Sequence, residues 1–147
     1  MDRQLLETKL QEFCQHLELE VAHGYKNRGL LNITPPRFGY EIGYKYALIY
    51  REHFTNVDQT ETQRIAQFRV AVHSAHGDIY GVKSWNQVNT RRWYGDLESF
   101  DEWSWAFSPN ATPKPGTLAE IQHGEREQQI RESHKQRGRP PTKQKEY

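Results

Sequence analysis

The sequence predicts an α+β fold, in which a long N-terminal helix packs on a curved antiparallel sheet of about five strands, followed by a peripheral C-terminal helix and a disordered basic tail. Apolar residues recur at helical spacing over the first 23 residues, and they alternate with polar residues in several later segments, as in strands. A proline-rich break at 108–116 then precedes a second helical stretch. We therefore expect a core domain (1–108), a linker with the peripheral helix (109–134) and a tail (135–147).

Residues 2–23 are expected to form one amphipathic helix that packs on the sheet. Asp2 has the side chain of an N-cap, and Gly24 is expected to end the helix. Cys14 lies beside the apolar positions, so we expect a buried thiol rather than a nucleophile. The apolar positions are spaced by three and four residues: Leu6, Leu10, Phe13, Leu17 and Val21.

Segments with strand periodicity follow the helix. Pro35 and Pro36 predict an irregular connection, because a proline restricts both itself and the residue before it. Gly77 stands where a tight hairpin turn needs a positive φ. The expected strands, in chain order, are 44–54, 63–74, 79–88, 91–97 and 101–107.

A second helix is expected after the proline-rich break. Thr117 and Glu120 have the spacing of a capping box, in which each side chain accepts a hydrogen bond from a free backbone amide. The helix would continue to about residue 134. Because it holds few apolar residues, we expect it to pack weakly on the domain.

Composition and cysteine usage exclude several classes of protein. The chain of 147 residues is 35% apolar and contains four Trp, eight Tyr and six Phe, which suffice for a modest core. A single cysteine excludes an internal disulfide and is typical of a reducing compartment. No apolar run reaches the length of a membrane span, and the first residues lack the pattern of a signal peptide. We therefore expect a cytoplasmic protein without a membrane partner.

The charge is unevenly distributed along the chain. Residues 133–147 carry five basic and one acidic residue, a net charge of +4, whereas the remainder carries 15 basic and 18 acidic residues, a net charge of −3. A basic tail on an acidic core is typical of an interaction arm. The core, by contrast, is not a basic platform for nucleic acid.

The tail contains Arg137, Gly138, Arg139 and Pro140 in succession. This tetrapeptide resembles the core of the AT-hook, a short motif that binds the minor groove of A·T-rich DNA, and the resemblance covers the tail segment 135–144 but none of the core domain. It implies that both arginines enter the narrow groove, where the negative potential is deepest, while glycine lets the backbone approach the groove floor. Three flanking lysines would then meet phosphates: Lys135, Lys143 and Lys145.

The motif departs from the AT-hook pattern on both sides. Gln136 stands where these motifs usually have a proline, and Pro141 and Thr142 follow where a lysine or arginine is usual. Fewer flanking charges imply weak binding by the tail alone. We therefore expect the tail to raise the local concentration of another binding element, in the core or on a partner.

A second candidate DNA contact lies in the segment 83–95. Lys83, Arg91 and Arg92 alternate there with aromatic and amide side chains, which could stack on bases or donate hydrogen bonds to them. The alternative is a hairpin whose tryptophans lie in the core and whose arginines are solvated. The strand spacing of the aromatic residues favours this alternative.

Four residues are candidate ligands for zinc or for a catalytic divalent ion: His53, His73, His76 and Asp78. Their spacing matches no strong metal motif, and the alternative is a set of solvated histidines at turns. The sequence also lacks the GxSxG, P-loop, GxGxxG and CxxC patterns. We accordingly expect no cofactor, no metal and no catalytic residue.

Three functions are compatible with these features. We expect a DNA-associated, non-enzymatic accessory protein, whose tail contacts A·T-rich double-stranded DNA while its core binds a protein partner or further DNA. The second function is a protein-interaction adaptor or inhibitor, of the kind that mobile elements encode, with no nucleic-acid role. The third is a small metal-dependent enzyme that uses the candidate ligands above. Exposed aromatic residues would favour the second function: Tyr44, Tyr46 and Tyr50, or Trp103 and Trp105.

Overall fold

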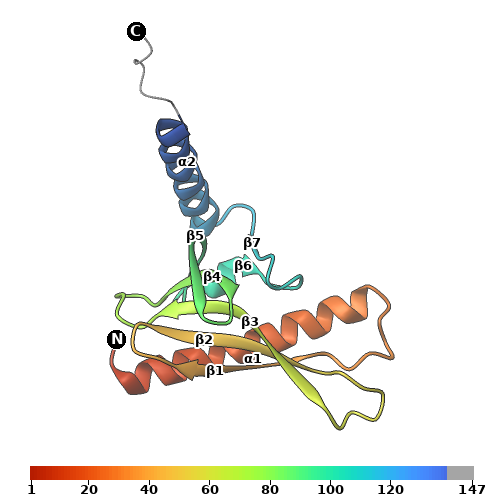
Figure 1. Ribbon diagram of the computed structural model, residues 1–147. Helices are drawn as coiled ribbons and strands as arrows, with labels where there is room; N and C mark the ends of the chain where they lie inside the picture. The colour runs from red at the N-terminus through yellow and green to blue at the C-terminus, as the bar shows by residue number, and fades with distance from the viewer. Residues whose placement is uncertain (139–147) are drawn as a thin grey trace.

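The computed structural model describes the backbone of residues 1–138 and the side chains of residues 1–133. It confirms the α+β fold, with an N-terminal helix, a five-stranded antiparallel sheet and a C-terminal helix (Figure 1). Each strand of this sheet pairs with the next along the chain, so the sheet is a meander. The elements are α1 (Arg3–Asn27), β1 (Arg37–Ile42), β2 (Tyr46–Phe54), β3 (Thr62–Ala71), β4 (Asp78–Ser84), β5 (Gln87–Asp96), the 3-10 turn η1 (Phe100–Glu102), β6 (Trp103–Ser104), β7 (Thr112–Pro113) and α2 (Leu118–Gly138).

Helix α1 packs on the sheet through its predicted apolar face, whose side chains are buried. The carboxylate of Asp2 accepts a hydrogen bond from an amide of the first turn at 2.9 Å, which confirms the N-cap. Gly24 does not end the helix. It is buried against Ala106, and a Cβ at this position would lie 3.2 Å from the Ala106 carbonyl oxygen. The residue just beyond the helix that adopts the left-handed conformation is Gly29, at φ +76°.

Cys14 lies in the packed interface between α1 and the sheet and is 5% exposed. Burial, with a smaller contribution from Glu18, raises the pKa of the Cys14 thiol to about 12. We therefore expect a thiol reagent such as Ellman's reagent to modify the folded protein far more slowly than the unfolded protein at about pH 8. Absorbance of the released thiolate measures both rates, and equal rates would contradict a buried Cys14.

Aromatic rings form the centre of the core. The ring of Phe13 lies 4.9 Å from that of Trp105 and 6.0 Å from that of Phe68, measured between centroids. Trp103 and Trp105 are both fully buried and lie 6.2 Å apart. These rings lie between α1 and the sheet, so the few apolar residues of the chain bury a large area.

The expected strand at 101–107 is wrong. Its first two residues belong to η1, only Trp103–Ser104 form a strand, β6, and this strand pairs with β7 rather than with the meander. The backbone N–H of Trp105 donates to the Glu20 carboxylate on α1 at 2.8 Å, and its indole N–H donates to the Phe100 carbonyl at 2.8 Å. The Glu20 carboxylate on α1 therefore accepts the backbone hydrogen bond that a neighbouring strand would have accepted.

Strand β1 lies where the sequence predicted an irregular connection. It begins directly after Pro36, and its first residue, Arg37, pairs with Glu52 of β2. The Phe38 side chain enters the core, while its N–H donates to the Glu18 carboxylate at 2.9 Å. The two prolines thus lie just before the strand, where their lack of an N–H removes no hydrogen bond from the sheet.

The other expected strands are present with shifted boundaries. Gly77 adopts φ +71° in the connection between β3 and β4, as its position in the sequence predicted. The expected strands 79–88 and 91–97 are redistributed as β4 and β5, which are separated by a turn between Ser84 and Gln87. The turn at Trp85 and Asn86 lacks glycine, so no turn motif marked its position in the sequence.

Helix α2 begins at the predicted cap. Glu120 N–H donates to the Thr117 hydroxyl at 3.3 Å, and the Glu120 carboxylate accepts from the Gly116 N–H at 3.1 Å. The helix continues to Gly138, four residues beyond the predicted end at about residue 134. Within the described residues, neither α1 nor α2 is long and apolar enough to cross a membrane.

Candidate nucleic-acid interface

The AT-hook-like motif begins in the last turn of α2. The backbone of Lys135, Arg137 and Gly138 is helical, but the side chains of the lysine and the arginine lie outside the described residues. The remaining predicted tail contacts lie wholly outside the described part of the chain: Arg139, Pro140, Lys143 and Lys145. The structure therefore describes the helix that leads into the motif, but not the contacts of the motif itself.

Three side chains on one face of α2 hold its first turns against β5 and β6. Ala119 is 2% exposed, the His123 ring lies 5.4 Å from the Trp103 ring, and the Arg126 guanidinium lies 4.7 Å above the Trp93 ring. The spacing of four and three residues brings all three onto the same side of the helix. A cation over an indole ring contributes about 0.5–1 kcal/mol at a partly exposed site.

The rest of α2 projects away from the sheet (Figure 1). Ile130 lines a groove against β5, and Gly138 is the last residue of the helix. At 1.5 Å of rise per residue, the helix carries Gly138 about 12 Å beyond Ile130. The start of the motif therefore stands clear of the domain.

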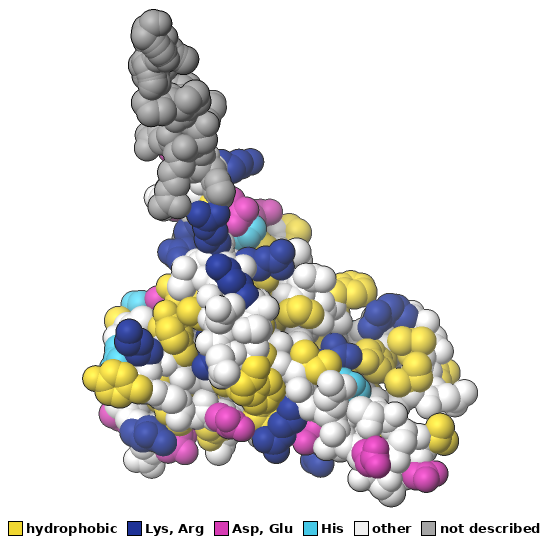
Figure 2. Space-filling model, viewed as in Figure 1, with side chains coloured by type: hydrophobic (Ala, Val, Ile, Leu, Met, Phe, Trp, Pro, Cys, Tyr) yellow, Lys and Arg dark blue, Asp and Glu magenta, His cyan; other side chains and the backbone are white. Residues whose placement is uncertain are grey.

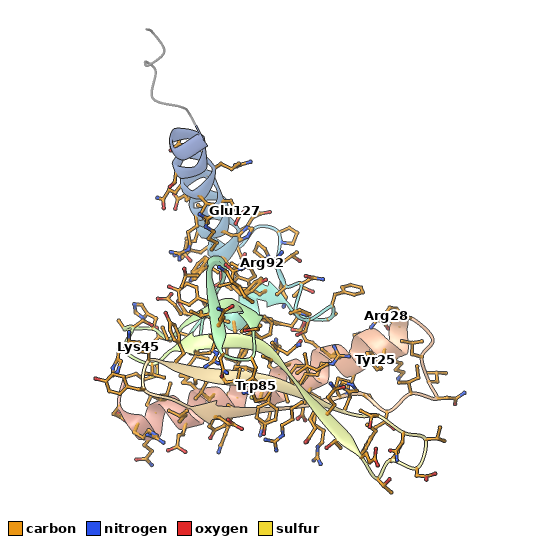
Figure 3. All side chains as sticks on the ribbon, viewed as in Figure 1. Tyr25, Arg28, Lys45, Trp85, Arg92 and Glu127 are labelled. Carbon is orange, nitrogen blue, oxygen red and sulfur yellow. The ribbon has the colours of Figure 1, made fainter. Side chains whose placement is uncertain are left out.

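Two of the three candidate DNA contacts in the core lie beside this helix. Arg91 and Arg92 on β5 are exposed and line a groove of about 370 Å³ together with His123 and Glu127 of α2. Figure 2 shows Lys and Arg side chains gathered where α2 meets the domain, and Figure 3 shows Arg92 and Glu127 near that junction. The third candidate, Lys83, is exposed on β4 near the tip of the β4–β5 hairpin.

The aromatic residues of the same hairpin are mostly part of the core. Trp93 is 8% exposed and Tyr94 is 7% exposed, so neither offers a free face for a base. Trp85, at the tip, is 38% exposed, and its ring stacks on Tyr50 with centroids 6.5 Å apart. The core-packed hairpin with solvated arginines, which the strand spacing favoured, thus describes Trp93 and Tyr94 but not Trp85.

Sequence reasoning missed Arg126, because it treated α2 as a weakly packed peripheral helix. Residues 118–133 of α2 contain four glutamates and two arginines, so this part of the helix has no basic composition. The available signal was the spacing of Ala119, His123, Arg126 and Ile130, which marks one helical stripe. That stripe holds only two aliphatic residues. Its other two members, His123 and Arg126, pack on the indole rings of Trp103 and Trp93.

Three of the four candidate metal ligands have separate partners, and the fourth, His53, has none of its own at Nδ1. His76 Nδ1 lies 2.7 Å from the Glu98 carboxylate, and Asp78 accepts a hydrogen bond from the Trp93 indole N–H at 3.1 Å. The His73 ring packs 5.6 Å from Tyr44, and His53 lies near the end of β2. Among residues with described side chains, no group of three or more His, Cys, Asp or Glu could hold a metal ion.

The aromatic residues that would have marked an interaction face are only partly exposed. Trp103 and Trp105 are fully buried, which rules them out as surface residues, whereas Tyr44 is 86% exposed. Tyr46 and Tyr50 are half-buried, and the Arg64 guanidinium lies 4.3 Å above the Tyr50 ring. The outer face of the sheet is thus partly covered by side chains of its own domain.

No protein-family model, curated protein or solved structure matches this chain.

Proposed function

We propose that this protein is a DNA-associated, non-enzymatic accessory protein. Its basic tail contacts the minor groove of A·T-rich double-stranded DNA, while the core binds a protein partner or further DNA. The observation that supports this proposal most is the projection of α2 from the domain, with the Arg137-Gly138 half of the motif in its last turn.

Projection matters because the rest of the chain is acidic. Residues 1–132 carry a net charge of −3, which opposes the approach of the domain to a phosphate backbone. Charges in solution are screened over about 8 Å at physiological ionic strength. A motif held about 12 Å beyond the last groove-lining residue of α2 is therefore separated by more than this screening length from the acidic residues of the domain itself.

The arginines at the base of α2 provide a second point of contact. Arg91 and Arg92 are exposed on β5, on the side where the helix leaves the domain, and phosphate groups would meet them if the duplex ran along α2. Two weak contacts on one molecule bind more tightly than either alone, because the first raises the effective concentration of the second.

Changing both tail arginines tests the proposal. Arg137→Ala combined with Arg139→Ala should weaken retention of an A·T-rich duplex roughly 10- to 100-fold and reduce the salt dependence of binding, because each arginine supplies about 1 kcal/mol or more. Fluorescence anisotropy with labelled A·T-rich and G·C-rich duplexes measures both effects. The matched control is Arg3→Ala with Arg64→Ala, which removes the same charge from exposed sites in the core. Equal loss in the control, or no loss in the tail variant, would refute the tail contact.

A protein-interaction module without a nucleic-acid role is the second candidate. It is favoured by exposed apolar side chains near the C-terminal end of α1 and the tip of the β2–β3 hairpin: Leu31 (73% exposed), Ile33 (53%), Val57 (98%) and Phe107 (59%). Partner capture that survives nuclease treatment and deletion of residues 135–147 would support this function over the first.

A further inference from the structure

The hydrophobic core ends before α1 does. On the inner face of β2, fully buried Ala47 and Ile49 are followed at the same alternation by Arg51 and His53. On α1, Val21 is followed one turn later by Tyr25. The sheet and the helix thus face one another through polar side chains at this end of the molecule.

Arg51 lies in this layer without a carboxylate partner. Its side chain is half-buried, and Nη2 donates to the Tyr25 hydroxyl at 2.9 Å. Its Nε is buried and has no hydrogen-bond partner. No ion pair among the described side chains includes Arg51. A partly desolvated cation whose protein partner is a neutral hydroxyl is unfavourable until an anion reaches it.

A second guanidinium lies close by. Arg28 sits 5.4 Å from the centre of the Tyr25 ring and 5.1 Å from that of Phe107, and its Nε donates to the Gly24 carbonyl at 3.2 Å. Figure 3 shows Tyr25 and Arg28 together at the C-terminal end of α1. These partners are also neutral, so both guanidinium groups keep their positive charge available.

Two adjoining pockets open beside Arg51, and we call them together the Arg51 cleft. One, of about 600 Å³, is lined by Arg51 and His53, by uncharged polar side chains, and by four apolar side chains: Ile33, Phe54, Val57 and Ile65. The other, of about 300 Å³, is lined by Arg28 and Arg51 with Phe107. Neither lining contains an aspartate or a glutamate, although the chain has 19 acidic residues. Figure 2 shows hydrophobic side chains around Lys or Arg atoms at this end of the molecule.

A larger neighbouring pocket has the opposite character. It measures about 820 Å³ and lies between α1 and the start of β1, and its wall contains the carboxylates of Glu18 and Glu52 with a single arginine, Arg37. Those carboxylates would repel an anion. The Arg51 cleft thus differs from this neighbouring pocket in carrying positive charge with no carboxylate in its wall.

We propose that the Arg51 cleft binds a small amphipathic anion, that is, a carboxylate or phosphate carried on an apolar chain or ring. A guanidinium group pairs with either acid group through charge-assisted hydrogen bonds, and His53 Nδ1, which is buried without a partner, offers a further polar contact. The apolar side chains of the wall take the body of the ligand, and the cavity size falls within the usual range of roughly 300–1,000 Å³ for small-molecule sites. This inference is independent of the DNA contact proposed for the tail.

Fluorescence of anilinonaphthalene sulfonate, an apolar aromatic anion, tests the cleft on the full-length protein. Decanoate should displace the dye, whereas decylammonium, with the same chain and the opposite charge, should not. Arg51→Leu should weaken dye and decanoate binding at least tenfold, since it removes the charge but keeps the apolar wall. Arg64→Leu, on the outer face of the sheet, should leave binding unchanged. Equal competition by decylammonium, or equal binding by the Arg51 variant, would overturn the proposal.

Amide chemical shifts of the unaltered protein provide a test that does not depend on the folding of a variant. Titration with decanoate and separately with decylphosphonate should shift the signals of residues 25–34, 51–54 and 65–67, and the tighter of the two acids identifies the acid group of the ligand. Shifts confined to the β4–β5 hairpin, or no saturable shifts with either acid, would exclude the cleft as the site.

Discussion

Replacing Trp105 with alanine should lower the free energy of unfolding by about 3–5 kcal/mol, the usual cost of removing a large aromatic side chain from a packed core. Trp105 is fully buried, and its ring lies within 5.3 Å of the ring centres of both Phe13 and Phe68. The substitution also removes the indole N–H that donates to the Phe100 carbonyl. It therefore loses packing and leaves an acceptor without its partner.

Urea denaturation followed by far-ultraviolet circular dichroism measures this loss. Trp85→Ala is the matched control, because the same side chain is removed from a position that is 38% exposed. Its cost should stay within about 1 kcal/mol. If the two variants lost the same stability, the aromatic centre between α1 and the sheet would not be the main core.

The sequence predicted those elements whose partners are close along the chain. The apolar face of α1 follows from a repeat of three and four residues, and the caps at Asp2 and Thr117 depend on amides within the same turn of helix. Alternation likewise located most of the meander. In each case the physical signal and the structure lie within a few residues of each other.

The segment around Trp105 could not be predicted in this way. Its alternating tryptophans have the pattern of a strand, but the hydrogen-bond partner of Trp105 N–H is Glu20, 85 residues earlier in the chain. Tertiary contacts therefore override local preference there. The end of α1 is a similar case, since Gly24 does not end the helix but lies in a close contact with Ala106, 82 residues later in the chain.

The Arg51 cleft left only a faint trace in the sequence. Arg51 and His53 continue the inward alternation of Ala47 and Ile49. In the sequence alone, however, they cannot be told from ordinary solvent-exposed strand residues, because the position of α1 over the strand is not known. The partner hydroxyl, on Tyr25, lies 26 residues away. The site lies where the buried apolar positions of α1 and those of β2 end at the same level of the molecule. Only the packed structure brings these two ends together.

Gly95→Ala should be the second strongly destabilising substitution, at about 2–5 kcal/mol. Gly95 adopts φ +81°, a conformation that costs an L-residue about 1–2 kcal/mol. A Cβ there would also lie 2.5 Å from Nε1 of Trp103, a fully buried ring that packs against Trp93 and Tyr94. Moving such a ring adds the cost of overpacking, about 1–3 kcal/mol.

Gly29→Ala separates the two contributions. Gly29 has nearly the same φ, +76°, but a Cβ at this position would meet no atom within 4 Å. Its substitution should therefore cost only the backbone strain, about 1–2 kcal/mol. The difference between the two variants in urea denaturation measures how firmly Trp103 is held. A difference near zero would mean that the Trp103 ring can shift at little cost in free energy. The contact of His123 with this ring would then not hold α2 in a fixed position on the domain.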